Sequence, residues 1–408
     1  MKQLRACLSL IGPLFYALVA AADAASGVSE DLPLTYIDTA FENASPLYWE
    51  IREDGEIDVF LLYDHERNSR NRAAGHWHFR VEADKGSTLT IVLNNLSNIY
   101  NGREGTPAKE ESVTFVSVDG QQWSPLETEL LEGNRLRFQL KMAAGVMYVA
   151  RVEPYRLSDL NGLLAEIKGH PRVHIERLGD TLAGRPLEII SIGRMDAPHH
   201  VLIRARAHPW EPGGNWVVQG MIRRLLKEDP FAADCLARYA IHTLPMANKD
   251  GVARGLTRFN LAGKDLNRNW DTPADARLAP ENAALERWIA KAIEEGRKPD
   301  LMIDFHNDQG GRLHIARPDV DLEVYLARMK NFEELLYAHT WFREGTTGGS
   351  YRNPGSIGEG LLERYGIHAC VHELNANWIA GLEEAPNSKN WELYGAQLCK
   401  VFLHLFED

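Results

Sequence analysis

The hydrophobic pattern of this chain changes near Pro154-Tyr155, and this change constrains the fold more than any other feature. Before it, turn-forming pairs such as Asp54-Gly55 and Asn101-Gly102 separate short apolar runs, which cover residues 57–63, 77–81, 88–93 and 135–140. Short strands at this spacing favour an all-β sandwich. After it, apolar strands alternate with longer amphipathic stretches, as in residues 158–168 and 281–295. This alternation favours an α/β fold with a mixed, mainly parallel sheet flanked by helices.

These patterns predict a β-sandwich domain over residues 26–155 and an α/β domain over residues 156–408. A chain of 408 residues is long enough for both domains. Neither a repeat nor a low-complexity linker separates them. We therefore expect a short join and close packing between the two domains.

The first 25 residues have the layout of a secretory signal. Lys2 and Arg5 precede an apolar run over residues 8–21, and small residues with a cleavage pattern at Ala22-Asp-Ala24 follow it. The run is interrupted by Pro13 and is short for a membrane span, which needs about 20 apolar residues. We predict a signal peptide over residues 1–25, export to the periplasm or the medium, and no stable membrane insertion after its removal.

Cysteine usage and charge exclude several classes of site. Cys7 lies in the predicted signal, and the other three cysteines, Cys235, Cys370 and Cys399, lack metal-binding spacing. We expect them to be buried thiols with at most one disulfide. The net charge is -12, and lysines and arginines are scattered along the chain. Such a surface lacks the basic footprint of a nucleic-acid-binding protein, so we expect no nucleic-acid partner.

His208 and Glu211 form a candidate metal-binding pair. Residues 198–207 before them read as a strand, and residues 213–227 after them read as a helix. The pair thus lies at the carboxyl end of a strand, where open α/β sheets place their ligands. By itself this H-x-x-E pattern is also typical of a loop histidine beside a solvated glutamate.

Two further strand ends supply the other groups that a zinc hydrolase needs. His306 ends the strand-like residues 298–306, and a polar, glycine-rich stretch follows. With His208 and Glu211 it would complete an open site for one Zn²⁺ ion. Glu373, near the end of residues 366–374, is a candidate general base, because a carboxylate beside a zinc-activated water commonly has that role. The alternatives are a bystander histidine and a solvated edge charge.

The densest polar segment of the chain covers residues 248–270. Within it, Arg258, Asn267 and Arg268 could form a fork that holds a carboxylate. Asp265 could accept a hydrogen bond from the far nitrogen of a ligand histidine. The other interpretation is a long surface loop with Asx turns.

Together these motifs resemble the zinc metallocarboxypeptidases of the funnelin type and, within them, the cytosolic-carboxypeptidase branch. The matching motifs, in chain order, are Leu178-Gly-Asp-Thr-Leu-Ala-Gly-Arg-Pro186, His208-Pro-Trp-Glu211, Asn248-Lys-Asp-Gly251, Asp265-Leu-Asn-Arg-Asn-Trp270, Asp304-Phe-His306 and Glu373-Leu374. Members of this branch carry a β-sandwich before the catalytic domain. Its landmarks resemble Trp77-His-Phe79, Asn94-Asn-Leu96 and Pro154-Tyr155 of this chain.

The resemblance implies a zinc-dependent carboxypeptidase that removes C-terminal residues from peptides or proteins. It implies that His208, Glu211 and His306 bind zinc, and that Glu373 is the base that later protonates the leaving amine. Asp265 would orient His208.

The resemblance also assigns groups that would contact the substrate. Arg258 would polarise the scissile carbonyl, and Asn267 and Arg268 would bind the terminal carboxylate. Tyr351 is a candidate for a tyrosine that covers the substrate, although residues 348–355 do not align cleanly with the family pattern.

Two of the motifs depart from the family pattern, at three positions. Asn307-Asp308 replaces small residues and a second histidine, which affects the expected substrate preference. Lys249 replaces a proline. Branch enzymes remove acidic residues with a basic group in the side-chain pocket, and the candidates for that group by location are Arg317, Arg343 and Arg352.

Several histidines outside the motifs receive no catalytic role. His76 and His78 share one face of a predicted strand, but the flanking Trp77 and Phe79 indicate an ordinary half-buried strand. Neighbouring His199 and His200 would point to opposite faces of a strand, and His372 would point away from Glu373 for the same reason.

Three functions remain open from the sequence. A carboxypeptidase is favoured by the predicted ligands, base and carboxylate clamp together. A zinc amidohydrolase acting on peptidoglycan stem peptides would share the metal chemistry but need a wider pocket. A non-enzymatic binding protein on the same fold would have lost a ligand or the base, and this sequence retains all of them. The predicted export favours a bacterial periplasmic or secreted enzyme with peptides or stem peptides as substrates.

Overall fold

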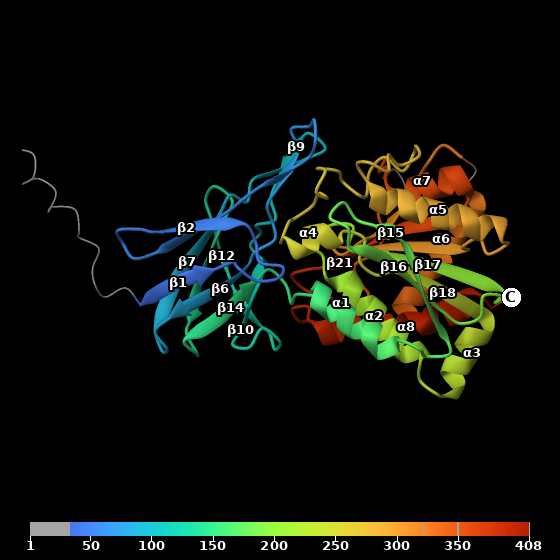
Figure 1. Cartoon of the computed structure of the whole chain (residues 1–408), viewed down its shortest axis with the longest axis horizontal. Coiled ribbons are helices and arrows are strands. Elements are labelled where there is room, and N and C mark those ends of the chain that lie inside the picture. The colour runs from blue at the N-terminus through green and yellow to red at the C-terminus, as the bar shows by residue number, and fades with distance from the viewer. Residues whose placement is uncertain (1–32, 321, 349–350, 408) are drawn as a thin grey trace, which may run out of the picture. The chain divides into compact units, whose positions relative to one another are not determined.

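The computed structural model describes residues 33–320, 322–348 and 351–407, and from Leu34 onward the chain forms one compact unit (Figure 1). The predicted signal peptide lies outside the described residues. None of the helices in the described part is long and apolar enough to cross a membrane.

The first part of the compact unit consists of two five-stranded sheets. The first sheet contains, in spatial order, β1 (Leu34–Asp38), β6 (His78–Ala83), β14 (Val146–Ala150), β10 (Val113–Ser117) and β11 (Ser124–Glu127). The second contains β12 (Glu129–Leu131), β13 (Arg135–Lys141), β7 (Thr88–Asn94), β3 (Ile57–Leu61) and β2 (Leu47–Ile51).

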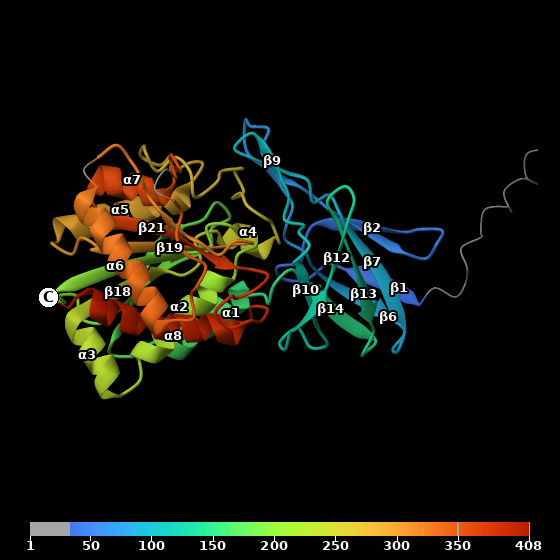
Figure 2. The ribbon, with the colours of Figure 1, turned by 180° about the vertical axis from the view of Figure 1, so that it is seen from behind.

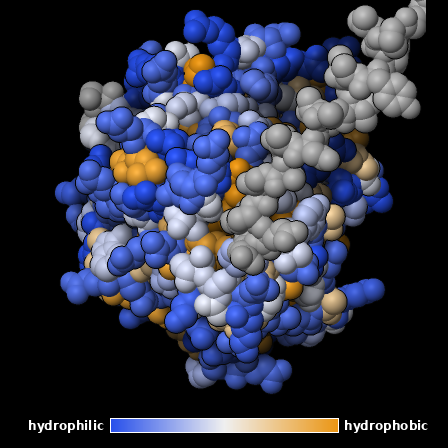
Figure 3. Space-filling model, turned by 90° about the vertical axis from the view of Figure 1, so that its left-hand side faces the viewer, coloured by the Kyte–Doolittle hydropathy of each residue, from blue (hydrophilic) through white to orange (hydrophobic). Residues whose placement is uncertain are grey.

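The two sheets enclose one apolar core because their strands alternate inward and outward side chains. In β13, Leu136, Phe138 and Leu140 are buried. They share a core with Phe79 and Val81 of β6 in the other sheet. The outer surface at this end of the molecule is mainly hydrophilic, with isolated apolar side chains (Figure 3). The predicted β-sandwich is confirmed.

A small four-stranded sheet extends from the sandwich. Its spatial order is β4 (Asp64–His65), β5 (Arg72–Ala73), β8 (Asn98–Tyr100) and β9 (Arg103–Gly105). Asn101 and Gly102 join β8 to β9 with φ angles of 50° and 73°, the left-handed pair that a tight hairpin requires.

The second part of the unit is built on a seven-stranded mixed sheet. Its spatial order is β15 (Val173–Asp180), β16 (Pro186–Ile192), β18 (Tyr239–Leu244), β17 (His199–Ala205), β19 (Leu301–Asp308), β21 (His368–Asn375) and β20 (Leu313–Ile315). The four strands β18, β17, β19 and β21 are parallel, whereas β15, β16 and β20 pair antiparallel with their neighbours. The predicted α/β fold with a mixed sheet is confirmed.

Helices cover both faces of this sheet (Figures 1 and 2). Val201 and Ile203 of β17 belong to an apolar cluster that also draws side chains from α2 (Gly213–Leu225), α3 (Pro230–Arg238), α6 (Glu323–His339) and α8 (Ser388–Leu405). Leu202, between them, belongs to a cluster with α5 (Pro280–Glu294) and α7 (Ile357–Tyr365). Because both faces are covered, these strands are almost continuously apolar.

Buried polar contacts join the sandwich to the α/β part. β14 ends at Ala150 and α1 (Leu157–Ile167) begins shortly afterwards. Arg151 is fully buried between them, where it donates to the carbonyl of Val113 at 3.0 Å and to Asn377 Oδ1 at 2.8 Å. Its guanidinium also lies over the ring of Trp77. The short join and close packing agree with the sequence-based expectation.

The three cysteines of the described residues, Cys235, Cys370 and Cys399, are free and buried. Burial raises the pKa of Cys370 above its usual range, so this thiol is unreactive. The expectation of buried thiols is confirmed.

Candidate metal and catalytic site

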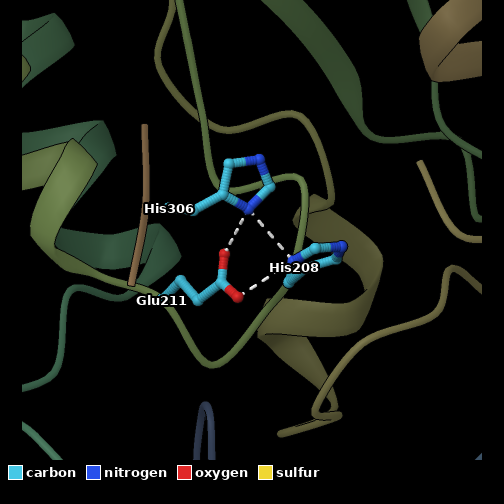
Figure 4. A group of neighbouring side chains, drawn as sticks. All are labelled: His208, Glu211 and His306. Carbon is cyan, nitrogen blue, oxygen red and sulfur yellow. Dashed lines mark hydrogen bonds and ion pairs between the residues drawn. The ribbon is translucent and has the colours of Figure 1, made fainter. Parts of the chain in front are cut away.

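Three predicted ligands converge at the carboxyl ends of neighbouring parallel strands (Figure 4). His208 Nδ1 lies 2.9 Å from Glu211 Oε1, and His306 Nδ1 lies 2.8 Å from Glu211 Oε2. The two Nδ1 atoms are 3.1 Å apart. All three side chains are buried. His208 follows β17 closely in the chain, and His306 belongs to β19, so the sheet itself brings them together.

The turn that carries His208 is held by Arg206. This residue has a left-handed φ of 63°, its Nε donates to the carbonyl of Pro209 at 2.7 Å, and Nη1 donates to Asn215 Oδ1 at 3.1 Å. At the start of α2, Gly214 is required because an added Cβ would lie 2.6 Å from Phe305 Cβ. The chain thus turns sharply from β17 into α2 and directs His208 and Glu211 toward His306.

The donor set fits one zinc ion. Two imidazole nitrogens and a carboxylate, with all ligand atoms within 4.8 Å of one another, are the protein ligands of an open catalytic zinc site. Burial alone would raise the pKa of Glu211, but the neighbouring histidines outweigh burial and lower it to about 2. Glu211 is therefore an anionic ligand at neutral pH.

A carboxylate holds the far nitrogen of each ligand histidine. His208 Nε2 donates to Asp265 Oδ1 at 3.1 Å, and His306 Nε2 donates to Asp304 Oδ2 at 2.6 Å. These bonds leave both Nδ1 atoms free to face a metal ion and fix the ring orientations. The first contact places Asp265 where the resemblance expects it. The contact of Asp304 was not predicted.

Behind Asp304 lies a fully buried arginine. Nε and Nη2 of Arg204 donate to the two carboxylate oxygens of Asp304 at 2.7 and 2.5 Å, and Nη1 donates to the carbonyl of Leu266 at 3.0 Å. Arg204 and Asp304 are partners in the β17–β19 register. The sequence signal was available, because both are charged residues inside otherwise apolar strands.

Glu373 lies on β21 directly opposite His306 in the register. Its Oε2 is shielded from solvent and has no hydrogen-bond partner in the described part of the chain. Burial, with the nearby carboxylate of Asp308, raises the pKa of Glu373 well above its usual range. A carboxyl group in this environment holds a proton readily, as a general acid and base must.

The predicted polar segment folds against the metal ligands. Nε and Nη2 of Arg258 donate to Asp265 Oδ2 at 2.8 and 2.7 Å. The backbone of Asn267 donates to Asp265 Oδ1 at 2.8 Å, and its side-chain Oδ1 accepts from the backbone of Ile357 at 3.0 Å. Arg268 Nη1 donates to the carbonyl of Asn267 at 2.7 Å. The segment is thus an ordered part of the site.

One cavity of about 390 Å³ unites most of the predicted site residues: it is lined by His208, Glu211, Arg258, Asn267, Arg268, Tyr351 and Glu373. The sandwich also contributes to its wall, through Gly75, Tyr100, Asn101, Thr106 and Pro107. Asp64 Oδ2 accepts from the backbone nitrogens of Arg258 and Phe259 at 2.7 and 2.8 Å. The sequence analysis did not predict that the first domain forms part of the site.

Three arginines were candidates for the basic group of a side-chain pocket. Of these three, Arg352 is the one found among the described residues that line the cavity. Arg352 is paired with Asp319 at 3.1 Å and lies 3.6 Å from Glu359. Arg343 instead donates to the carbonyls of Thr340 and Phe342, and Arg317 donates to that of Ala316. Arg317 and Arg343 are not among the described residues that line the cavity.

The two departures from the family motifs have structural roles. Asn307 Oδ1 accepts from the backbone of Gly213 at 2.8 Å, and Nδ2 donates to the carbonyl of Leu374 at 3.0 Å. Asn307 thereby ties the start of α2 to β21. Lys249 is buried and pairs with Glu188.

The histidines excluded from the site have other partners. His76 Nε2 lies 2.9 Å from the backbone carbonyl of Asn43, and His78 Nδ1 lies 3.2 Å from the side-chain Oδ1 of Asn43. Both are buried rather than half-buried, and burial lowers the pKa of His76 to about 4. His372 contacts the hydroxyl of Tyr394 at 2.5 Å, away from Glu373.

Comparisons with known proteins agree with this geometry. Residues 163–310 match the zinc carboxypeptidase family, and residues 37–152 match the cytosolic carboxypeptidase N-terminal domain. An uncharacterized protein of Zymomonas mobilis is 27% identical over 66% of this chain and 64% of its own length. Human cytosolic carboxypeptidase 4 is 33% identical over 32% of this chain and 13% of its own length. The chain thus spans less than two thirds of these relatives.

A metallo-carboxypeptidase from Burkholderia cenocepacia has a similar structure, with a TM-score of 0.79 and 21% identity over 91% of this chain and 98% of that one. This likeness shows that the whole fold, β-rich domain included, is that of a metallocarboxypeptidase. The chain thus carries a cytosolic carboxypeptidase N-terminal domain followed by a zinc carboxypeptidase domain.

Proposed function

We propose that this protein is a zinc-dependent carboxypeptidase that hydrolyses the last peptide bond of peptides or proteins with a free C-terminus. One observation carries the proposal. Asn267 and Arg268 line the same cavity as the metal ligands and Glu373. A carboxylate clamp beside a hydrolytic centre confines cleavage to the chain end, because an internal peptide bond has no free carboxylate to bind.

His208, Glu211 and His306 would hold the zinc ion, which acts when bound as a Lewis acid that polarises a carbonyl and lowers the pKa of water to about 7. Glu373 would take a proton from the attacking water and deliver it to the leaving amine. Its Oε2 has no hydrogen-bond partner among the described residues, so it is available for this transfer.

The arginines of the cavity have separate tasks. Arg258 uses Nε and Nη2 on Asp265, and we assign the remaining Nη1 to the scissile carbonyl oxygen as it becomes negative. Removal of one such donor typically slows turnover by about 100- to 1,000-fold. Arg268 donates a hydrogen bond to the neutral carbonyl of Asn267, so we assign its positive charge to the terminal carboxylate of the substrate.

The test compares Glu373→Gln with wild-type protein on peptides that carry either a free or an amidated C-terminus, with products identified by mass. We expect wild-type protein to release single residues from the free peptide alone. Glu373→Gln should bind one zinc ion per chain and lose most turnover. Glu363→Gln, an exposed substitution on α7, is the matched control.

Equal cleavage of the amidated peptide would overturn the assignment of the clamp. Release of internal fragments or of stem-peptide units would instead support a zinc amidohydrolase. A protein that binds zinc but gives no product from any peptide would support the non-enzymatic function.

We further propose that the protein is exported. The support is the arrangement of Lys2, Arg5, the apolar run over residues 8–21 and the small residues after it. Expression of the full chain in a Gram-negative host, followed by fractionation and N-terminal sequencing, tests this. Mature protein in the periplasm or medium, beginning near residue 25, is expected. An intact chain in the cytoplasm would refute export.

A further inference from the structure

The backbone around Arg258 lacks regular structure of its own. Arg258 belongs to residues 254–279, which the structure describes throughout and which form neither helix nor strand. In such a stretch the backbone N–H groups are not paired within a helix or a sheet, so they need other partners. The position of the Arg258 side chain relative to the metal ligands therefore depends on contacts from other parts of the molecule.

Some of these contacts come from the first domain. Asp64 of β4 lies 194 positions before Arg258 in the chain, and its Oδ2 accepts from the backbone nitrogens of Arg258 and Phe259 at 2.7 and 2.8 Å. The preceding residue, Thr257, accepts through Oγ1 from the backbone nitrogen of Gly75 at 3.0 Å. Three consecutive residues that include Arg258 are thus held by the first domain.

The hydrogen-bonding capacity of Asp64 is directed to this backbone. Its second oxygen, Oδ1, is shielded from solvent and has no hydrogen-bond partner in the part of the chain that the structure describes. A carboxylate is costly to place in such surroundings unless hydrogen bonds compensate for the lost water. The two bonds from Arg258 and Phe259 provide that compensation.

The first domain also contacts the side chain of Arg258. Its guanidinium carbon lies 5.3 Å from the ring centroid of Tyr100, within the distance of about 6 Å at which a cation and an aromatic ring attract each other. The Tyr100 hydroxyl accepts from Asn98 Nδ2 at 2.5 Å, and Asn98 Oδ1 accepts from the backbone of Ala74 at 2.7 Å. The ring is therefore fixed to the first domain, and it lines the cavity together with Arg258.

The α/β part restrains the same guanidinium through Asp265, which accepts from Nε and Nη2 of Arg258. Nη1 is the nitrogen that we assign to the scissile carbonyl. A donor stabilises a developing negative charge best when it is in place before the reaction. Since a displacement of about 1 Å can slow turnover by about 100-fold, contacts that fix Arg258 should contribute to kcat.

We propose that Asp64 and Tyr100 are positioning residues that hold Arg258 for catalysis, so that the first domain completes the catalytic site. The inference rests on the proposed carboxypeptidase function, which assigns Arg258 its task. It gives the first domain a part in the reaction in addition to its packing against the α/β part.

The test measures kcat and KM of zinc-loaded Asp64→Leu on a peptide that the wild-type protein trims at its C-terminus. Leucine resembles aspartate in shape but cannot accept a hydrogen bond. We expect kcat to fall by about 10- to 100-fold. KM should stay within about threefold of the wild-type value, because the role assigned to Arg258 is in the transition state. Asp84→Leu, at an exposed position of the first domain, is the matched control and should leave both constants unchanged.

Conservative variants separate positioning from bulk packing. Asp64→Asn keeps an oxygen that can accept from both backbone nitrogens, so its kcat should stay within about threefold of the wild-type value. Tyr100→Phe keeps the ring and should behave likewise, whereas Tyr100→Leu should lower kcat by about 3- to 30-fold. If Asp64→Asn loses as much activity as Asp64→Leu, the hydrogen-bond account is wrong.

A double-mutant cycle tests whether Asp64 acts through Arg258. Arg258→Met should lower kcat by about 100- to 1,000-fold. In that background Asp64→Leu should change kcat by no more than about threefold, because the group that it positions is already gone. The same loss in both backgrounds would overturn the inference.

Failure of this inference differs from failure of the proposed function. If wild-type protein trims the peptide and Asp64→Leu retains its kcat, the positioning role is wrong while the carboxypeptidase stands. If zinc-loaded wild-type protein releases no residue from any peptide, the proposed function itself fails. Should Asp64→Leu not fold, Tyr100→Leu in the same two backgrounds provides the comparison, and an equal loss in both would overturn the inference.

Discussion

Replacement of Arg204 by methionine tests how the metal site is held from behind. Arg204 is fully buried and neutralises Asp304, which in turn holds His306 Nε2. Methionine fills a similar volume but leaves the Asp304 carboxylate without its cation in a dry interior. Removal of one partner of a buried ion pair typically lowers the free energy of unfolding by about 3–5 kcal/mol.

For Arg204→Met we expect a loss in the free energy of unfolding near the middle of this range. His306 still donates one hydrogen bond to Asp304, which offsets part of the lost interaction. The carbonyl of Leu266 loses its bond from Arg204 but still accepts from Trp270 Nε1 and Asn282 Nδ2 at 2.9 and 3.1 Å. The main loss is therefore the charge on Asp304. Because His306 also loses a firmly held orienting partner, zinc affinity should fall by about 10- to 100-fold.

The assay is urea unfolding of the metal-free protein in chelator, together with zinc affinity from competition with a chromogenic chelator. The variant Arg204→Met/Asp304→Asn removes both charges and should recover at least ~1 kcal/mol relative to Arg204→Met. Arg194→Met, in an exposed pair with Asp196, is the control and should unfold like the wild type. A loss below ~1 kcal/mol for Arg204→Met, with zinc affinity unchanged, would refute this account of the site.

Two further substitutions test other parts of the structure. Glu281 is buried, and burial raises its pKa to about 7, so wild-type stability should decline as the pH rises from 4.5 to 7. In urea unfolding of metal-free protein, the free energy of unfolding of Glu281→Gln should match that of the wild type near pH 4 and exceed it by about 3 kcal/mol at pH 8. A difference that does not change with pH would contradict the raised pKa of Glu281. Gly255 has a φ of 61°, and an added Cβ would overlap the carbonyl of Ala44 where the two domains meet. Gly255→Ala should lower the melting temperature more than Gly184→Ala, which has a φ of 78° but open space around it; equal losses would show that the domain contact tolerates the change.

Local pattern predicted the three strands that carry the site, β17, β19 and β21, and its error at the end of β19 has a tertiary cause. The polar residues Asn307 and Asp308 follow an apolar run and predict a loop after His306. In the structure β19 continues through both, because they pair with Leu374 and Asn375 of β21. Backbone pairing with a neighbouring strand outweighs the polarity of two side chains, and a single sequence contains no direct sign of that neighbour.

The candidate site divides in the same way between motif residues and residues brought in by packing. His208, Glu211, His306 and Glu373 were predictable because each follows an apolar strand in the chain. Tyr100 was not, because its place in the cavity wall depends on how the sandwich packs on the α/β part.

Arg204 and Asp304 lie between these cases. An arginine within a buried parallel strand can be accommodated only if an opposite charge lies within reach. The predicted strand over residues 298–306 contains an aspartate close to its start and another near its end. Arg204 lies four residues before His208, whereas Asp304 lies two residues before His306, so aligning the two ligands does not pair Arg204 with Asp304. The partner is selected by the register of β17 and β19, which a single sequence does not contain. Charge alone thus predicts that Arg204 needs a carboxylate within the sheet, whereas the place of His314 in the cavity wall has no such signal, because β20 is only three residues long and lacks a recognisable strand pattern.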